Sequence, residues 1–192
     1  MPEWIDIGPC EALSIEGDSD ATAIFMPGSR GAGAQALLAY TRLGLEELGW
    51  SSLLVWDEYQ DDGRHAEWVR ERVDAALATA PGRDVVLVAK SLSSFAAGVA
   101  AARGIRAVWY TPLLTEELVV ADLRRATAPF LLVGGTADPM WDASVARAVS
   151  GEVVEIEGAD HSLQRPRDLA GSVAVLRDVV ARAAAFIGSP PH

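Results

Sequence analysis

Cysteine is almost absent from this sequence of 192 residues, which holds a single one, Cys10. One cysteine cannot form a disulfide within the chain, and this scarcity is typical of reducing intracellular compartments. The first twelve residues have neither the basic segment nor the apolar run of a secretory signal peptide. We therefore expect a cytoplasmic protein in which the thiol has no special role.

Long apolar runs, histidine clusters and basic patches are also missing. No run of apolar residues approaches the length of about 20 that a membrane-spanning helix requires. The three histidines, His65, His161 and His192, show no metal-ligand spacing with other candidate ligands. Sixteen basic residues against 27 acidic ones give a net charge of −11, which disfavours nucleic acid and anionic membranes as partners.

The residues that are present can build one substantial hydrophobic core. Half of them are hydrophobic, and the 22% that are charged are dispersed along the chain. We find no repeat, linker or low-complexity segment. The sequence predicts a single domain over residues 1–187 and a loose C-terminal tail at 188–192.

Short apolar segments alternate with amphipathic ones along the chain. This alternation predicts an α/β fold, a three-layer α/β/α sandwich around a mostly parallel, doubly wound sheet. The first two strands look like a hairpin at a sheet edge. The expected strands are Trp4–Ile7, Ala12–Glu16, Ala21–Met26, Ser52–Trp56, Val85–Ala89, Ile105–Tyr110, Phe130–Val133 and Glu152–Ile156. The expected helices are Ala34–Leu48, His65–Ala80, Ser93–Ala102, Leu114–Thr127, Ser144–Val149 and Arg167–Ile187.

A serine lies where the most apolar strand meets a helix rich in small residues. Ser91 has Ala89 two positions before it and Ser93 two positions after it. Small neighbours suit a nucleophile elbow, because its sharp turn brings backbone and helix close together. The alternatives are a simple helix cap and a phosphate-binding loop. The apolar strand before Lys90 argues against the loop, which would need glycines there.

Two further side chains complete a chemical set in the order Ser91, Asp138, His161. A serine hydroxyl needs a base within hydrogen-bond reach, and the imidazole needs an acceptor for its other nitrogen. Both partners follow predicted late strands, so they should meet Ser91 at the carboxyl edge of the sheet, where ligands bind in such folds. We expect the neighbouring Asp160 to be structural.

An acyl-transfer site also needs donors for the developing oxyanion. We assign one to the backbone N–H of Leu92. The other should come from the loop after Ala21–Met26, from the N–H of Ser29 or, second, of Gly28.

The same loop suggests a rival function. Residues 31–36 match the dinucleotide-binding pattern G-x-G-x-x-A, and Asp57 ends the next strand. However, four residues separate strand and motif, where the pattern should begin at once. Dinucleotide binding would also leave Ser91, Asp138 and His161 unexplained.

Four segments together resemble the α/β-hydrolase superfamily, over nearly the whole chain. The nearest likeness is to its small, cap-less members, the dienelactone-hydrolase-like and KANL3/Tex30-like group. The resemblance implies Ser91 as nucleophile, Asp138 as acid and His161 as base, with no metal or organic cofactor. Pro27 departs from the usual histidine, and Ala89 and Ser93 replace both elbow glycines. The four segments are Met26–Ser29, Ala89–Ser93, Gly134–Asp138 and Gly158–Ser162.

The sequence therefore predicts a serine hydrolase that cleaves a carboxylic ester or related small acyl substrate through an acyl-enzyme. No insertion follows Ile105–Tyr110, so only Thr111–Val120 could cover an otherwise shallow, open site. Trp56, Tyr110 and Trp141 are candidates to line it. The degenerate elbow leaves an alternative, a catalytically silent binding module. Acyl transfer to an acceptor other than water and the oligomeric state stay open.

Overall fold

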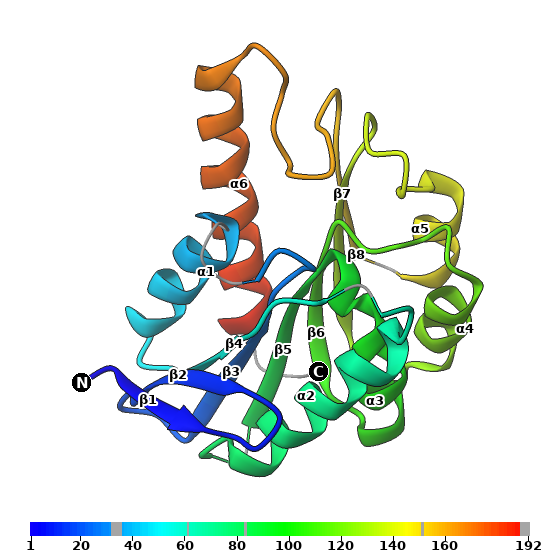
Figure 1. Cartoon of the computed structure of the whole chain (residues 1–192). Coiled ribbons are helices and arrows are strands. Elements are labelled where there is room, and N and C mark those ends of the chain that lie inside the picture. Colours follow the sequence, from blue (N-terminus) through cyan, green and yellow to red (C-terminus); the bar gives the residue numbers. More distant parts are fainter. Residues whose placement is uncertain (32–35, 61, 83, 151, 189–192) are drawn as a thin grey trace.

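The strands form a single eight-stranded sheet in the order β1-β2-β4-β3-β5-β6-β7-β8 (Figure 1). The computed structural model describes residues 1–31, 36–60, 62–82, 84–150 and 152–188. β1 pairs with β2, and β2 with β4, in antiparallel fashion, whereas every other neighbouring pair is parallel. The strands are β1 (Glu3–Asp6), β2 (Glu11–Ile15), β3 (Ala21–Met26), β4 (Ser51–Trp56), β5 (Asp84–Lys90), β6 (Arg106–Tyr110), β7 (Phe130–Gly135) and β8 (Glu152–Ile156).

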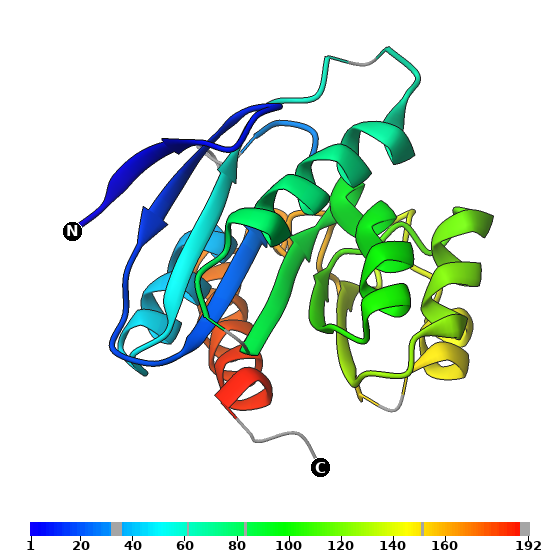
Figure 2. The same ribbon diagram turned by 90° about the horizontal axis from the view of Figure 1, so that it is seen from below.

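Helices cover both faces of this sheet, which confirms the predicted three-layer, mostly parallel architecture (Figure 2). One face carries α1 and α6, and the other carries α2, α3, α4 and α5. The helices are α1 (Ala36–Glu46), α2 (His65–Thr79), α3 (Ala97–Arg103), α4 (Glu117–Arg125), α5 (Ala143–Val149) and α6 (Leu169–Gly188), and a 3₁₀ helix, η2 (Ser91–Ala96), precedes α3.

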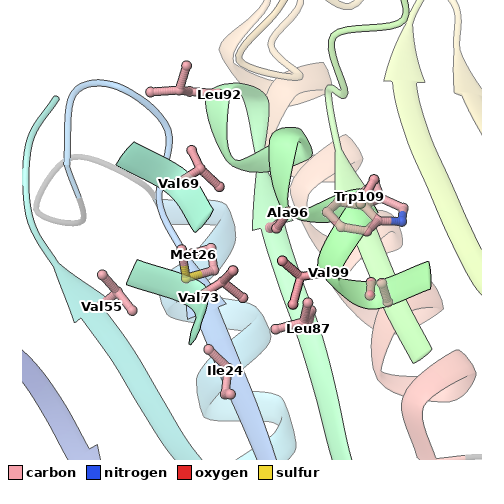
Figure 3. Packing of buried hydrophobic residues seen from close by; sticks show 14 of the residues in the cluster. Ile24, Met26, Val55, Val69, Val73, Leu87, Leu92, Ala96, Val99 and Trp109 are labelled. Atoms are coloured by element: carbon pink, nitrogen blue, oxygen red, sulfur yellow. The ribbon is translucent and has the colours of Figure 1, made fainter. Parts of the chain in front are cut away.

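Side chains of the central strand β5 contribute to two hydrophobic cores. Leu87 and Ala89 point into the core beneath α2 to α5, whereas Val86 and Val88 point into the core beneath α1 and α6. Figure 3 shows Leu87 among side chains from neighbouring strands and helices of the first core. Because successive side chains of a strand face opposite ways, a strand buried on both faces must be apolar at every position. This explains why the stretch before Ser91 has no alternation of polar residues.

Most element bounds agree with the sequence-based expectation within three residues, and the N-terminal hairpin lies at the sheet edge as predicted. The exception is α3, which was expected to begin at Ser93 and begins at Ala97, because residues 91–96 form the 3₁₀ helix η2. The start of α4 was expected at Leu114 and lies three residues later, at Glu117. The N–H of Leu114 instead bonds the carbonyls of Pro112 and Met140. Residues 111–116 therefore form a short connection between β6 and α4, which leaves no room for a lid domain.

Two predictions concern residues outside the described ranges. Residues 32–35 hold most of the G-x-G-x-x-A match, and residues 189–192 hold most of the predicted tail. None of the helices in the described part of the chain is long and apolar enough to cross a membrane.

Candidate active site

Ser91 occupies a strained turn between β5 and the 3₁₀ helix η2. Its φ is 52°, in the left-handed region that side-chain-bearing residues rarely adopt. Ser94, one turn further on, donates from its hydroxyl to the carbonyl of Ser91 and accepts the N–H of Leu113 at 3.1 Å. These bonds tie the turn to the β6–α4 connection. Ser91 itself remains half-exposed at the carboxyl edge of the sheet.

Three side chains meet at that edge in one hydrogen-bonded chain. The Oγ of Ser91 lies 2.7 Å from Nε2 of His161, and Nδ1 of His161 lies 2.8 Å from Oδ2 of Asp138. The His161 side chain keeps 35% of its surface exposed, whereas the Asp138 side chain is fully buried. A solvent-accessible hydroxyl and imidazole backed by a buried carboxylate is the arrangement that nucleophilic catalysis requires.

The turn after β7 holds the Asp138 carboxylate in place. Its second oxygen, Oδ1, accepts the backbone N–H of Met140 at 2.9 Å. The N–H of Ala137 donates to the carbonyl of Ala159 at 3.0 Å, joining the loops that carry Asp138 and His161. A β-carbon on Gly135 would lie 2.1 Å from that same carbonyl, so only glycine permits this approach. Gly135 thus permits the close contact between the two loops.

Asp160 does not touch the ring of its neighbour His161 in this network. Its Oδ1 instead accepts the N–H groups of Ser162 and Gln164, at 2.8 and 3.0 Å. Asp160 therefore closes the turn that presents His161, in agreement with the structural role expected from the sequence.

Lys90 adds a positive charge directly before Ser91. Its Nζ donates to the carbonyl of His161 at 3.1 Å, so it braces the loop that presents the imidazole. Burial lowers the pKa of Lys90 from its ordinary value, and the carboxylates of Asp138 and Asp160 partly oppose that shift. Sequence reasoning passed over this contact because the residue before a nucleophile carries no fixed requirement in the elbow pattern.

The predicted oxyanion donors lie on two different segments. Leu92 is the second residue of η2 and is buried, whereas Gly28 and Ser29 lie on the loop after β3, buried and exposed respectively. The carbonyl of Gly28 accepts the N–H of Gly31, and the carbonyl of Ser29 accepts the N–H of Tyr59. In a trans peptide the N–H opposes the preceding carbonyl, so the N–H of Ser29 faces out of the turn.

The three aromatic residues predicted to line the site have other neighbours. Tyr110 is fully buried beneath α1, with its hydroxyl 2.9 Å from Oγ1 of Thr41, and burial raises its pKa above the usual range. Tyr110 therefore belongs to the core, which corrects the sequence-based interpretation: the last residue of β6 faces α1 and not the carboxyl edge.

The two tryptophans also make contacts that account for their presence. Trp56 packs edge-on against Trp4, with ring centroids 5.1 Å apart, near the antiparallel edge of the sheet. Trp141 lies against Gly134, and its Nε1 donates to Glu155 at 2.8 Å. A contact between either ring and a substrate stays a prediction.

Thr111 is an unusual residue that sequence reasoning did not interpret beyond its place at a strand end. It is fully buried with a φ of 43°, and it follows β6 beside Ser91 across the sheet. Within the described ranges, its hydroxyl is the one buried side-chain polar atom without a hydrogen-bond partner. No sequence pattern signals such a feature, because it depends on long-range packing.

The described residues contain no group of three or more histidine, cysteine, aspartate or glutamate side chains that could hold a metal ion. A hollow of about 280 Å³ lies between Thr127, Phe130 and Glu152, at the amino ends of β7 and β8. It therefore lies at the opposite edge of the sheet from Ser91.

Known structures share this architecture at low sequence identity. Est1E from Butyrivibrio proteoclasticus is 16% identical, with 97% of each chain covered and a TM-score of 0.71. The esterase Pf2001 from Pyrococcus furiosus is 14% identical over 97% of this chain and 91% of that one, with a TM-score of 0.71. XC6422 from Xanthomonas campestris, an α/β serine hydrolase without a lid, is 18% identical over 100% and 96% of the two chains, with a TM-score of 0.63.

No protein-family model matches the sequence, and no curated protein matches it. The structural likeness nevertheless assigns the fold. The chain has the α/β serine hydrolase fold in a lid-less form, as the resemblance of the four sequence segments implied.

Proposed function

We propose that this protein is a serine hydrolase that cleaves small carboxylic esters. One observation carries the proposal: the Ser91 hydroxyl lies 2.7 Å from an imidazole whose other nitrogen contacts the buried carboxylate of Asp138. Several structural neighbours are esterases by name, which supports the same class of reaction.

The reaction begins with attack of the Ser91 Oγ on the ester carbonyl carbon. Nε2 of His161 takes the hydroxyl proton, and Asp138 stabilises the resulting imidazolium through Nδ1–H. The carbonyl oxygen becomes an oxyanion, which the N–H groups of Leu92 and Ser29 bind. The alcohol leaves with the proton from His161, and the acyl group stays on Ser91.

Water then completes the cycle by the reverse proton path. His161 removes a proton from water, the hydroxide attacks the acyl carbon, and Ser91 leaves with the proton from the ring. Transfer to an alcohol would use the same acyl-enzyme, so the ratio of acid to new ester formed in added methanol measures that alternative. Neither route requires a metal or organic cofactor.

The shape and charge of the molecule narrow the substrate class. The short 111–116 connection leaves the carboxyl edge without a covering domain, which suits small or chain-end acyl groups. A net charge of −11 disfavours strongly anionic substrates. One structure of the neighbour Est1E has ferulic acid bound, which supports a small acyl substrate for this chain.

A silent binding module is the second candidate, since Ala89 and Ser93 replace the two elbow glycines. Both replacements fit the fold: Ala89 pairs with Met26 and Trp109 inside the sheet, and Ser93 is fully buried with a hydrogen bond. The turn at Ser91 keeps its left-handed φ. The altered motif therefore gives no structural reason for inactivity.

A fluorophosphonate probe and a panel of p-nitrophenyl esters from acetate to decanoate test the proposal. Wild type should react with the probe at Ser91 and hydrolyse the short esters fastest. Ser91→Ala should abolish labelling and lower turnover by at least about 1,000-fold. Ser162→Ala, an exposed serine beside His161, is the matched control and should keep both activities. Turnover that survives in Ser91→Ala, or a wild type inert to all these reagents, would contradict the proposal.

A further inference from the structure

Ser93, the residue that departs from the elbow motif, makes an unusual contact. Its side chain is fully buried, and its hydroxyl donates to the carbonyl of Pro27 at 2.5 Å. Pro27 is also buried and is the first residue after β3. The bond therefore joins the first turn of η2 to the loop that carries the predicted oxyanion donors.

This bond fixes one of three successive carbonyls in that loop. The carbonyl of Pro27 accepts from Ser93, that of Gly28 from the N–H of Gly31, and that of Ser29 from the N–H of Tyr59. No cis peptide occurs in the described chain, so each fixed carbonyl also fixes the direction of the N–H that follows it. Of the three bonds, only the one from Ser93 connects the loop to the elbow itself.

The connection matters because an oxyanion hole needs two donors at a set separation. One donor, the N–H of Leu92, adjoins Ser93 in the chain. The other, the N–H of Ser29, lies two residues after Pro27. The carbonyl of Pro27 shares its peptide group with the N–H of Gly28, the second candidate donor, and the N–H of Ser29 belongs to the next peptide group. The bond from Ser93 to Pro27 therefore joins the segment of Leu92 to the segment that carries both candidate loop donors.

We propose that Ser93 is a positioning residue that holds the β3 loop in register with the elbow and so sets the geometry of the oxyanion hole. The inference rests on the proposed esterase function. A glycine at this position, as in the G-x-S-x-G pattern, would supply no such bond. The serine is thus a second means of securing the hole, and not a defect of the motif.

Kinetics of Ser93→Ala and Ser93→Gly test this role. Each variant should lower kcat by about 10- to 100-fold, because misplaced donors weaken binding of the oxyanion. The KM for a short ester should change by less than about threefold, since the oxyanion exists only after attack. The inhibition constant of a trifluoromethyl ketone, which forms the same oxyanion on Ser91, should rise in proportion to the fall in kcat.

Two further measurements separate positioning from general damage. The midpoint of the pH profile of kcat/KM should stay unchanged, since the contacts of His161 and Asp138 remain intact. Ser52→Ala is the matched control, because Ser52 is equally buried in β4 and donates to Glu46 at 2.9 Å. It should keep kcat and the ketone affinity of wild type.

Each outcome decides the inference. Full kcat in both Ser93 variants, or a loss of kcat with unchanged ketone affinity, would overturn the role of Ser93 while wild-type turnover still upheld the esterase. A wild type without turnover or probe labelling would remove the esterase and the inference together. Using two variants guards against misfolding, because glycine and alanine differ in helix propensity but both lack the hydroxyl.

Discussion

The two sides of Ser91 are built in different ways. On the side of β7 and β8, Asp138 and His161 follow their strands after short turns, and backbone bonds join these turns. The N–H groups of Thr136 and Ala137 each donate at 3.0 Å to carbonyls of the β8 segment. On the side of β3 and β4, the predicted donors Gly28 and Ser29 lie on a longer loop that is held by Ser93 and Tyr59.

This difference separates two requirements of the proposed chemistry. Proton transfer needs three side chains in line, and the β7–β8 side supplies them from paired, closely packed turns. Oxyanion binding needs backbone donors at the right spacing, and the β3–β4 side obtains it through a few specific bonds. We therefore expect single substitutions on the first side to abolish chemistry or folding, and those on the second to have graded effects.

The largest expected effect is that of Asp138→Asn on the β7–β8 side. An amide of the same size can keep the contact with Met140, but it no longer stabilises the imidazolium of His161 or enforces its tautomer. Steady-state kinetics should show kcat lower by about 1,000- to 10,000-fold, with the thermal midpoint changed little. Asp160→Asn provides the matched control and should stay within about threefold of wild type. Equal losses in the two variants would show that Asp138 has no special part.

A pair of glycine substitutions compares the two sides directly. Gly135→Ala places a β-carbon 2.1 Å from the carbonyl of Ala159, so the paired turns must separate. Gly31→Ala places one 3.1 Å from the carbonyl of Asp57, at a φ of +72°. Urea denaturation should show a loss above about 3 kcal/mol for the first variant and of about 1 to 2 kcal/mol for the second. An equal or reversed order would contradict the proposed contrast between the sides.

Much of the β7–β8 side could be predicted from the sequence. Asp138 lies three residues after β7 and His161 five residues after β8, and parallel strands bring such residues to one edge whatever the details of the helices. The order Ser91, Asp138, His161 then matched the order of nucleophile, acid and base that the α/β-hydrolase resemblance implies. Local pattern was sufficient because short turns leave a side chain little freedom of position.

The β3–β4 side could be predicted only in outline. The loop after β3 was expected to supply donors, but the bond from Ser93 to Pro27 joins residues 66 positions apart. The face on which Tyr110 lies depends on the parity of β6, and a one-residue difference reverses it. The orphan hydroxyl of Thr111 likewise results from tertiary packing, which no local pattern encodes.

Thr111→Val tests the buried hydroxyl without a partner that lies between the two sides, and its expected effect is smaller. Valine has nearly the same shape, and it removes a buried hydroxyl without a partner, so the free energy of unfolding should rise by about 1 kcal/mol. Both residues are β-branched, so the strain of the φ of 43° is the same in each and cancels. Urea denaturation measures the gain, with Thr79→Val on the exposed surface of α2 as control. A loss of stability would show that the hydroxyl has a favourable partner.

The smallest expected effect concerns Cys10, the one thiol of the chain. Its ionisation depends on Asp57, which follows β4, so it probes the β3–β4 side. Burial raises its pKa to about 11, and the carboxylate of Asp57 adds to the shift. At pH 7 the thiol is protonated in both the folded and the unfolded state, so its ionisation does not affect stability there. As the pH rises from about 9 to 11, only the unfolded state loses the proton, so wild type should lose more stability than Cys10→Ser.

The rate of Cys10 alkylation by iodoacetamide at pH 8.5 also compares ionisation of the thiol in the folded and the unfolded chain. Folded wild type should react more slowly than the chain in 8 M urea, because the thiolate is the reacting form. Asp57→Asn removes one cause of the raised pKa and should speed the folded reaction modestly. Since Asp57 also pairs with Arg72 at 2.9 Å, Arg72→Gln is the counterpart and should slow it, because Arg72 lowers the same pKa. Faster alkylation in both variants would mean that the connection between β1 and β2, which carries Cys10, opens. Solvent access and not charge would then control the reaction rate of the thiol.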